Sequence, residues 1–309
     1  MIDRYQRECW VAAALGVLLL VLARFAPDFF AYQNLRSVLL ENGPVLVAAV
    51  GMTLVILSRN IDISIGAQVA VCGTIAGLVA EAGWPVPMAA GAALLAGAGL
   101  GAVNGALVAG LNLPSIVVTL ATWVILRESL SWARSGEFVR NLPADFQWFG
   151  AGQSTGQWLV VAIAVAVFLV FAWSLRYLAA GRAVYATGSD QEAARLAGIR
   201  PRRVVFGVFV TMGALSGLSA LLIAVRFPQV DPRMGTGLEL QTIAAVVVGG
   251  VAISGGRGTL IGSLIGVALL GTIKPALGFM HTDVHWETAI QGMIILLAVA
   301  SDAWGQRRS

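Results

Sequence analysis

Two polar segments interrupt the apolar stretches of this 309-residue chain, and their side chains can form hydrogen bonds to one another or to a polar ligand. The first reads SRNIDISIG over 58–66, and the second reads SGGRGTLIG over 254–262. The candidate residues for such contacts are Asn60, Asp62, Ser64 and Arg257. Paired, glycine-interrupted apolar segments in the two halves of a chain are typical of a solute path through a membrane. The two segments therefore predict the lining of a path; the alternative is a pair of cytoplasmic turns.

Other polar residues lie inside the apolar stretches, where they are costly to bury. Asn104 lies in the small-residue run AGAGLGAVNGAL, and Glu239 and Gln241 follow the segment PQVDPRMGTG. These three are further candidates for the path, although for Asn104 the sequence favours a hydrogen bond between helices. Arg127 and Glu128 are adjacent, and we expect them to reach the membrane interface as a pair.

No charge falls at the centre of an apolar stretch. A carrier driven by protons or sodium ions usually needs a buried carboxylate or an ion cage there, so this pattern disfavours such a carrier. It suits a path for a neutral, hydroxylated solute.

Residues for catalysis or metal binding are scarce. His281, Asp283 and His285 resemble a metal cluster, but they lie in a short connection, where a solvated loop is the better interpretation. Cys9 and Cys72 have no spacing typical of a disulfide framework or a metal site. No G-x-x-x-x-G-K-[ST] sequence is present, so the chain is not expected to bind ATP itself. We expect no cofactor, no metal and no enzymatic activity.

The polar residues must be positioned by membrane-spanning helices. Hydrophobic residues make up 58% of the chain and charged residues 12%, and the mean hydropathy is +0.83. Runs of roughly 20 apolar residues, enough to cross a bilayer, recur along the chain, and no alternating strand pattern appears. The expected fold is all-α, with one transmembrane domain over 1–309. The predicted spans are 10–26, 36–58, 65–81, 85–111, 114–133, 157–175, 204–226, 238–253, 258–273 and 286–302.

Basic residues gather at three places: Arg4 with Arg7, the connection 176–203, and Arg307 with Arg308. Cytoplasmic loops carry an excess of Lys and Arg, so this excess does not indicate nucleic-acid binding. An even number of predicted spans separates each place from the next. The sequence therefore predicts that both termini and the 176–203 connection are cytoplasmic.

The connection 176–203 also holds a short helix with its own start and stop signals, in the sequence ATGSDQEAARLAGIRPRR. Ser189 and Glu192 have the spacing of a capping box, and Gly198 is a typical residue after a helix end. About two turns remain between them, which are marginal alone in water. We therefore expect the helix to dock on a partner. Its predicted contact residues are Ser189, Asp190, Glu192, Ala193, Ala194, Arg195 and Gly198.

Taken together, these segments resemble the permease subunits of bacterial ATP-binding-cassette importers for monosaccharides, the ribose, xylose and arabinose group, and their relatives for autoinducer-2 and rhamnose. The similarity runs from about residue 34 to 302. It is carried by NIDISIG at 60–66, YATGSDQEAARLAGI at 185–199, TGLELQTIAAVVVGGVAISGGRGTLIGSLIG at 236–266, and the pattern from Trp286 to Asp302. The stretch from Glu192 to Gly198 is similar to the first half of the coupling motif of such permeases, and the second half of that motif is absent.

The resemblance implies an importer in the bacterial inner membrane for a pentose, rhamnose or autoinducer-2. It implies a second permease subunit, identical or similar, and a separate nucleotide-binding ATPase subunit that receives the helix at 190–198. A periplasmic or lipid-anchored solute-binding protein would deliver the solute to the outer loops 134–156 and 227–237. Membrane lipid is a further partner: Arg202 and Arg203 are interpreted as contacts to anionic lipid rather than to the ATPase.

Two other classes stay open. A secondary transporter would need no ATPase, and its transport would collapse with the ion gradient. An intramembrane enzyme would need paired histidines or carboxylates within spans, and the sequence shows none.

Overall fold

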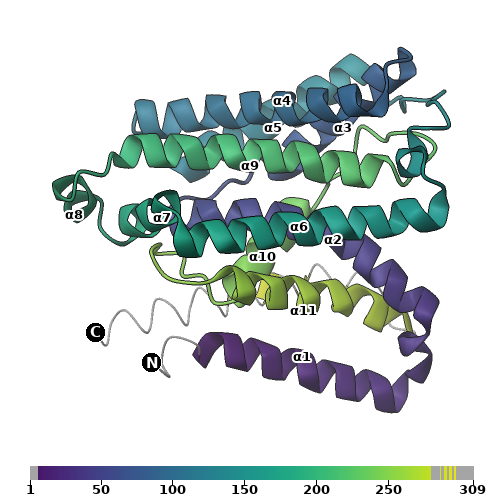
Figure 1. Ribbon diagram of the computed structural model, residues 1–309, viewed down its shortest axis with the longest axis horizontal. Coiled ribbons are helices and arrows are strands. Elements are labelled where there is room, and N and C mark those ends of the chain that lie inside the picture. The colour runs from purple at the N-terminus through teal and green to yellow at the C-terminus, as the bar shows by residue number, and fades with distance from the viewer. Residues whose placement is uncertain (1–5, 280–285, 287–288, 291, 294–295, 297–309) are drawn as a thin grey trace.

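The computed structural model describes residues 6–279, together with 286, 289–290, 292–293 and 296. Its long helices run side by side in one bundle, and a short helix projects from the bundle at one end (Figure 1). In chain order the elements are α1 (Gln6–Phe25), η2 (Pro27–Phe30), α2 (Tyr32–Leu57), α3 (Ile65–Glu81), α4 (Val86–Gly105), η3 (Ala106–Gly110), α5 (Ser115–Arg134), η4 (Gln147–Gly150), α6 (Gln153–Tyr177), α7 (Ala179–Ser189), α8 (Gln191–Leu196), α9 (Pro201–Ala224), α10 (Leu238–Val248) and α11 (Leu260–Phe279).

Seven of the described helices are long and apolar enough to cross a membrane, and the predicted all-α fold is confirmed. They are α1, α2, α4 with η3, α5, α6, α9 and α11. Helices α3 and α10 lie within two further predicted spans, 65–81 and 238–253. With 17 and 11 residues, both are shorter than the seven long helices. The tenth predicted span, 286–302, lies mostly outside the described residues.

Backbone-to-backbone contact joins α4 and α9 along their length. A Cβ added at Gly97 would clash with the carbonyl oxygen of Gly213, and one added at Gly213 would clash with that of Gly97. Gly101 lies in the same way against the backbone of Phe209. Because lipid tails are as apolar as the helices, the hydrophobic effect does not drive helices together in a membrane. Small residues that allow close van der Waals contact stabilise such pairs instead. The backbones of α4 and α9 therefore pack in direct contact at these glycines.

The chain between α9 and α10 leaves the end of the bundle opposite to α8 and runs back along α3 (Figure 1). An antiparallel bridge first joins Val230 to Val139. Met234 then packs over Gly73, and Gly235 approaches Gly66 at the start of α3. Helix α10 consequently begins inside the bundle, which explains its short length. The sequence predicted the whole of 227–237 as an outer loop, and its second half is instead packed against a helix.

The two polar interruptions meet at the end of the bundle from which α8 projects. The Gly256 amide donates to the Leu57 carbonyl at 3.0 Å, and the Tyr185 hydroxyl of α7 donates to the Gly258 carbonyl at 2.9 Å. The Thr259 hydroxyl donates to Glu8 Oε1 of α1 at 2.6 Å. The first turn of α1 therefore lies at the same end as α7 and α8, as Figure 1 shows.

Candidate functional site

Helix α8 is defined by a cap at each end. The Asp190 carboxylate accepts hydrogen bonds from the backbone amides of Glu192 (2.8 Å) and Ala193 (3.0 Å). The capping residue is therefore Asp190, and the predicted Ser189–Glu192 capping box is wrong. Ser189 is the last residue of α7, where its backbone is still helical, and a cap residue must lie outside the helix. Either side chain is chemically able to cap, so the one-residue offset is set by where α7 ends.

The C-terminal end of α8 is a Schellman turn. The Ile199 amide bonds to the Ala194 carbonyl and the Gly198 amide bonds to the Arg195 carbonyl, both at 3.0 Å. Gly198 adopts φ +81°, a conformation that favours glycine. The stop signal predicted at Gly198 is thus observed.

Helix α8 buries one side chain and exposes the rest. Ala194 is 3% exposed and packs toward the bundle, whereas Leu196 is 85% exposed at the tip. Ala193 is also exposed, and Glu192 forms an ion pair with Arg195 at 3.3 Å. An exposed leucine flanked by an ion pair on a six-residue helix is a surface that another protein can cover.

A buried polar cluster follows α2. Asp62 Oδ1 accepts a hydrogen bond from the Ser64 amide at 2.9 Å and another from the Ser64 hydroxyl, and Asp62 Oδ2 accepts one from Gln68 Nε2 at 3.2 Å. Asp62, Ser64 and Gln68 are all fully buried. A buried carboxylate is tolerated only when such hydrogen bonds replace its water. This cluster fixes the turn between α2 and α3.

Asn104 of α4 connects this cluster to two more helices. Its amide nitrogen donates to Ser64 Oγ at 2.9 Å, and its carbonyl oxygen accepts from the Thr122 hydroxyl of α5 at 2.8 Å. The interhelical hydrogen bond that the sequence favoured for Asn104 is thus the arrangement found.

Helix α5 supplies the groups that the sequence reasoning missed. The Ile61 amide donates to Ser115 Oγ at 3.2 Å, and the Ile63 amide donates to Thr119 Oγ1 at 3.1 Å. With Thr122, these hydroxyls lie along one face of α5. A hydroxyl every three or four residues in an apolar span is the signal that marks this face, and Gln68 is a similar lone polar residue in α3.

Glu239 lies in the first turn of α10, against Gly66. Its side chain is buried, and its Oε2 atom has no hydrogen-bond partner among the described residues. Arg127 of α5 faces the same region, because its Nη1 donates to the Met234 carbonyl at 3.4 Å while its Nη2 is buried and unpartnered in the described part of the chain. Glu128 is exposed whereas Arg127 turns toward the Met234 carbonyl, so the two side chains point in different directions and do not form the predicted pair. Asp62 and Glu239, both candidates from the sequence, are buried in the bundle at the starts of α3 and α10 rather than at the centre of a long span.

The remaining candidates lie apart from the buried cluster. Gln241 is half-buried in α10, and Arg257 is exposed in the turn before α11. Asn60 is half-buried, and its amide donates to the Ser58 carbonyl at 2.8 Å. Within the first polar segment, the structure thus separates Asn60 from the enclosed Asp62 and Ser64.

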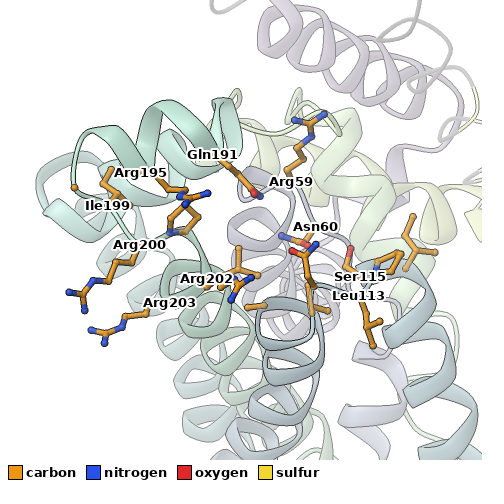
Figure 2. Close-up of a pocket in the computed structure, with 18 residues that line it drawn as sticks. Arg59, Asn60, Leu113, Ser115, Gln191, Arg195, Ile199, Arg200, Arg202 and Arg203 are labelled. Atoms are coloured by element: carbon orange, nitrogen blue, oxygen red, sulfur yellow. The ribbon is translucent and has the colours of Figure 1, made fainter.

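Asn60 faces a groove of about 1090 Å³ at the end of the bundle that carries α8 (Figure 2). One wall comes from α8 and the start of α9, and the other from the α2–α3 turn and the α4–α5 connection. Figure 2 shows the side chains of Arg195 and Arg202 between these walls, with Arg200 and Arg203 extending away. The groove brings the predicted docking helix next to one predicted path residue. His281, Asp283 and His285 lie outside the described residues, and the described part of the chain holds no metal-binding group of three or more acidic, histidine or cysteine side chains.

Comparison with known proteins gives one consistent result. Residues 34–299 match the family model "Branched-chain amino acid transport system / permease component". The chain is 34% identical to the ribose import permease protein RbsC of Escherichia coli K12, over 97% of this chain and 96% of that protein. It is 32% identical to the autoinducer 2 import system permease protein LsrC of Salmonella typhi, over 96% and 85% of the two chains, and 33% identical to LsrC of Escherichia coli O157:H7, over 98% and 89%. No solved structure matches the chain.

A family match over most of the chain and full-length relatives above 30% identity agree with the helical bundle and its candidate membrane spans. The chain therefore belongs to the branched-chain amino acid transport system permease family, as a multi-pass permease component of an ATP-binding-cassette importer of the ribose and autoinducer-2 type, a family that has no catalytic activity of its own.

Proposed function

We propose that this permease imports a small, neutral, hydroxylated solute of the pentose, rhamnose or autoinducer-2 class. The relatives are named for ribose and for autoinducer 2, both at similar identity, which supports the class and not one member. Polar atoms inside the bundle support the same class. Glu239 and Arg127 each keep an unpartnered buried atom among the described residues, and a solute hydroxyl can donate to the carboxylate and accept from the guanidinium.

The path in this proposal runs past α10 and α3 toward the groove at Asn60. Asn60, Glu239 and Gln241 contact the solute, whereas Asp62, Ser64 and Asn104 hold the helices that form the path. Arg257 lies at its inner mouth. We assign a second permease subunit, identical or similar, to complete the path, and a periplasmic or lipid-anchored binding protein to the outer segments 134–156 and 227–237.

Helix α8 is the proposed docking element for a separate ATPase subunit, and the observation that carries this proposal is its geometry. It is capped at both ends, it projects from the bundle, and it exposes Leu196. Docking on a cytoplasmic ATPase places this end of the molecule in the cytoplasm. The start of α1 lies at the same end, so the proposal puts the N-terminus in the cytoplasm too, and the ten predicted spans put the C-terminus on the same side.

Two substitutions test the docking. Glu192→Lys reverses the charge beside Leu196, and Leu196→Glu removes the exposed apolar side chain. Each is expected to leave membrane insertion intact and to abolish co-purification of the proposed ATPase subunit. Glu137→Lys, an exposed charge reversal in the 134–156 segment, is the matched control and should keep the ATPase bound. Undiminished co-purification in both α8 variants would refute the docking role.

A secondary transporter is the alternative function. Uptake of labelled ribose and of autoinducer 2 in cells lacking the ATPase subunit separates the two. Uptake that survives without the ATPase and collapses with the ion gradient would support the secondary transporter.

A further inference from the structure

The last turn of α7 lies against the backbones of both polar interruptions. The Gly256 amide donates to the Leu57 carbonyl at 3.0 Å, and Gly188 of α7 packs directly on this hydrogen bond. A Cβ added at Gly188 would clash with the Leu57 carbonyl oxygen and would meet the Gly256 amide nitrogen. Glycine has no Cβ, so it allows such close approach of backbones. We call this contact of Gly188, Leu57 and Gly256 the glycine joint.

Further contacts hold the second interruption to α7. A Cβ added at Gly255, which adopts φ +83°, would meet both Arg59 and the Gly188 carbonyl oxygen. The Tyr185 hydroxyl of α7 donates to the Gly258 carbonyl at 2.9 Å. The end of α2, the turn before α11 and the last turn of α7 are therefore packed together over several residues.

Helix α8 is joined to α7 without a loop. Asp190 alone lies between them: its amide donates to the Ala186 carbonyl of α7 at 3.1 Å, and its carboxylate caps α8. On the other side, residues 197–200 separate α8 from α9 and include Gly198 in a left-handed conformation. A displacement of α8 is therefore passed more directly to α7 than to α9.

Two candidate path residues follow the glycine joint closely in the sequence. Asn60 comes shortly after Leu57 in the first interruption, and Arg257 directly follows Gly256 in the second. Because one contact holds the backbones of both interruptions, neither can move far without the other. A closely packed contact transmits a displacement, since it leaves no free space in which the displacement could be absorbed.

We infer that Gly188 is a positioning residue for transport: through it, a displacement of α8 moves both polar interruptions, and with them Asn60 and Arg257, as one unit. The inference rests on the proposed docking of the ATPase on α8. It assigns the step from the docked helix to the solute path to one backbone contact. A variant that opens this contact should therefore keep the ATPase bound and active while the path no longer responds to ATP.

The test follows both interruptions in the transporter assembled with the ATPase. Asn60→Cys and Arg257→Cys are introduced separately, together with Cys9→Ser to remove the exposed native thiol. The rate of labelling by a water-soluble maleimide is measured without nucleotide and with ATP and vanadate. With Gly188 present, ATP is expected to change both rates about tenfold, within the usual range of coupling between two sites. With Gly188→Ala, both changes should fall below that range, because the added Cβ separates the joint.

Two further variants control for folding. Gly207→Ala, at an exposed position of α9 where a Cβ meets nothing within 4 Å, should keep the full response to ATP. Tyr185→Phe removes the hydrogen bond to Gly258 and adds no volume, so it decides the question if Gly188→Ala fails to insert. It is expected to lower the response about threefold, the effect of one hydrogen bond.

Bound ATPase and basal ATP hydrolysis are measured in every variant, which separates this inference from docking. Leu196→Glu should lose the ATPase, whereas Gly188→Ala should keep it and its hydrolysis. Retention of the ATPase in Leu196→Glu would refute docking on α8, while the labelling in Gly188→Ala still reports on the joint. The inference is wrong if Gly188→Ala responds to ATP as the wild type does, or if its response falls only as far as bound ATPase falls. It is also wrong if only one of the two positions responds to ATP.

Discussion

The side-chain amide of Asn104 donates a hydrogen bond of 2.9 Å to the hydroxyl of Ser64, the N-cap residue of α3. That hydroxyl makes no capping hydrogen bond and instead donates to the Asp62 carboxylate. Through this one contact α4 is tied to the turn between α2 and α3. All three side chains are fully buried, so none can exchange its partner for water.

Replacing Asn104 is therefore expected to be costly. Asn104→Leu removes the two side-chain hydrogen bonds that tie α4 to Ser64 and to Thr122, each worth about 0.5–1.5 kcal/mol. We expect a lower unfolding temperature of the purified chain and reduced uptake of ribose or autoinducer 2 by the assembled transporter. Val103→Leu, at the exposed neighbouring position, is the control and should leave both quantities unchanged.

Asn60 and Asp62 should respond differently to alanine. Asp62→Ala removes the acceptor of three hydrogen bonds inside the bundle, so the chain should insert poorly or unfold at lower temperature. Asn60 is half-buried beside the groove, and Asn60→Ala should leave folding and assembly intact while lowering uptake. Thermal unfolding, co-purification of the ATPase and uptake are measured for both variants. Wild-type uptake in Asn60→Ala would remove that residue from the path.

Gly97 and Gly99 of α4 offer a matched pair of alanine substitutions. A Cβ at Gly97 meets the backbone of Gly213 in α9, whereas a Cβ at Gly99 meets nothing within 4 Å. Gly97→Ala forces the helices apart and should destabilise the chain by about 1–3 kcal/mol. Gly99→Ala should be neutral or stabilising by up to about 1 kcal/mol, because alanine has a higher helix propensity than glycine. The difference in unfolding temperature in detergent measures the contact, and equal values would contradict it.

Asp190 and Ser189, at the start of α8, offer a second matched pair of alanine substitutions. Asp190→Ala removes two hydrogen bonds to the start of α8 and should cost about 1 kcal/mol of local helix stability. Ser189→Ala changes no cap and should be silent. Because α8 is so short, we expect faster amide hydrogen exchange over 191–196 in Asp190→Ala alone, with weaker retention of the ATPase. If Ser189→Ala accelerated the exchange more than Asp190→Ala, Ser189 and not Asp190 would be the capping residue.

The sequence predicts the apolar helices well because their period and length follow from the thickness of a bilayer. The predicted span 65–81 coincides with α3, whose start is marked by Ser64 and whose end by Gly83 and Pro85. It predicts the short helix before Gly198 with its start at Gln191 and its end one residue too late, and it assigns the cap to Ser189 in place of Asp190. The family resemblance stated from the motifs is confirmed.

Other features depend on contacts that no local pattern encodes. Gln68 reads as a single polar residue in an apolar span until Asp62 is found beside it. Glu239 reads as the start of a span at the membrane surface, because nothing in PQVDPRMGTG shows that the segment descends along the glycines of α3. The arginines of the groove come from three separate segments, and only the folded chain places them together.

The glycine contact between α4 and α9 has a mechanical consequence. Helix α9 begins five residues after the last residue of α8 and is locked against α4 along the face that holds Gly97 and Gly101. A displacement of α9 therefore carries α4 with it, and the Asn104 side chain of α4 passes that displacement to the turn that holds Ser64 and Asp62.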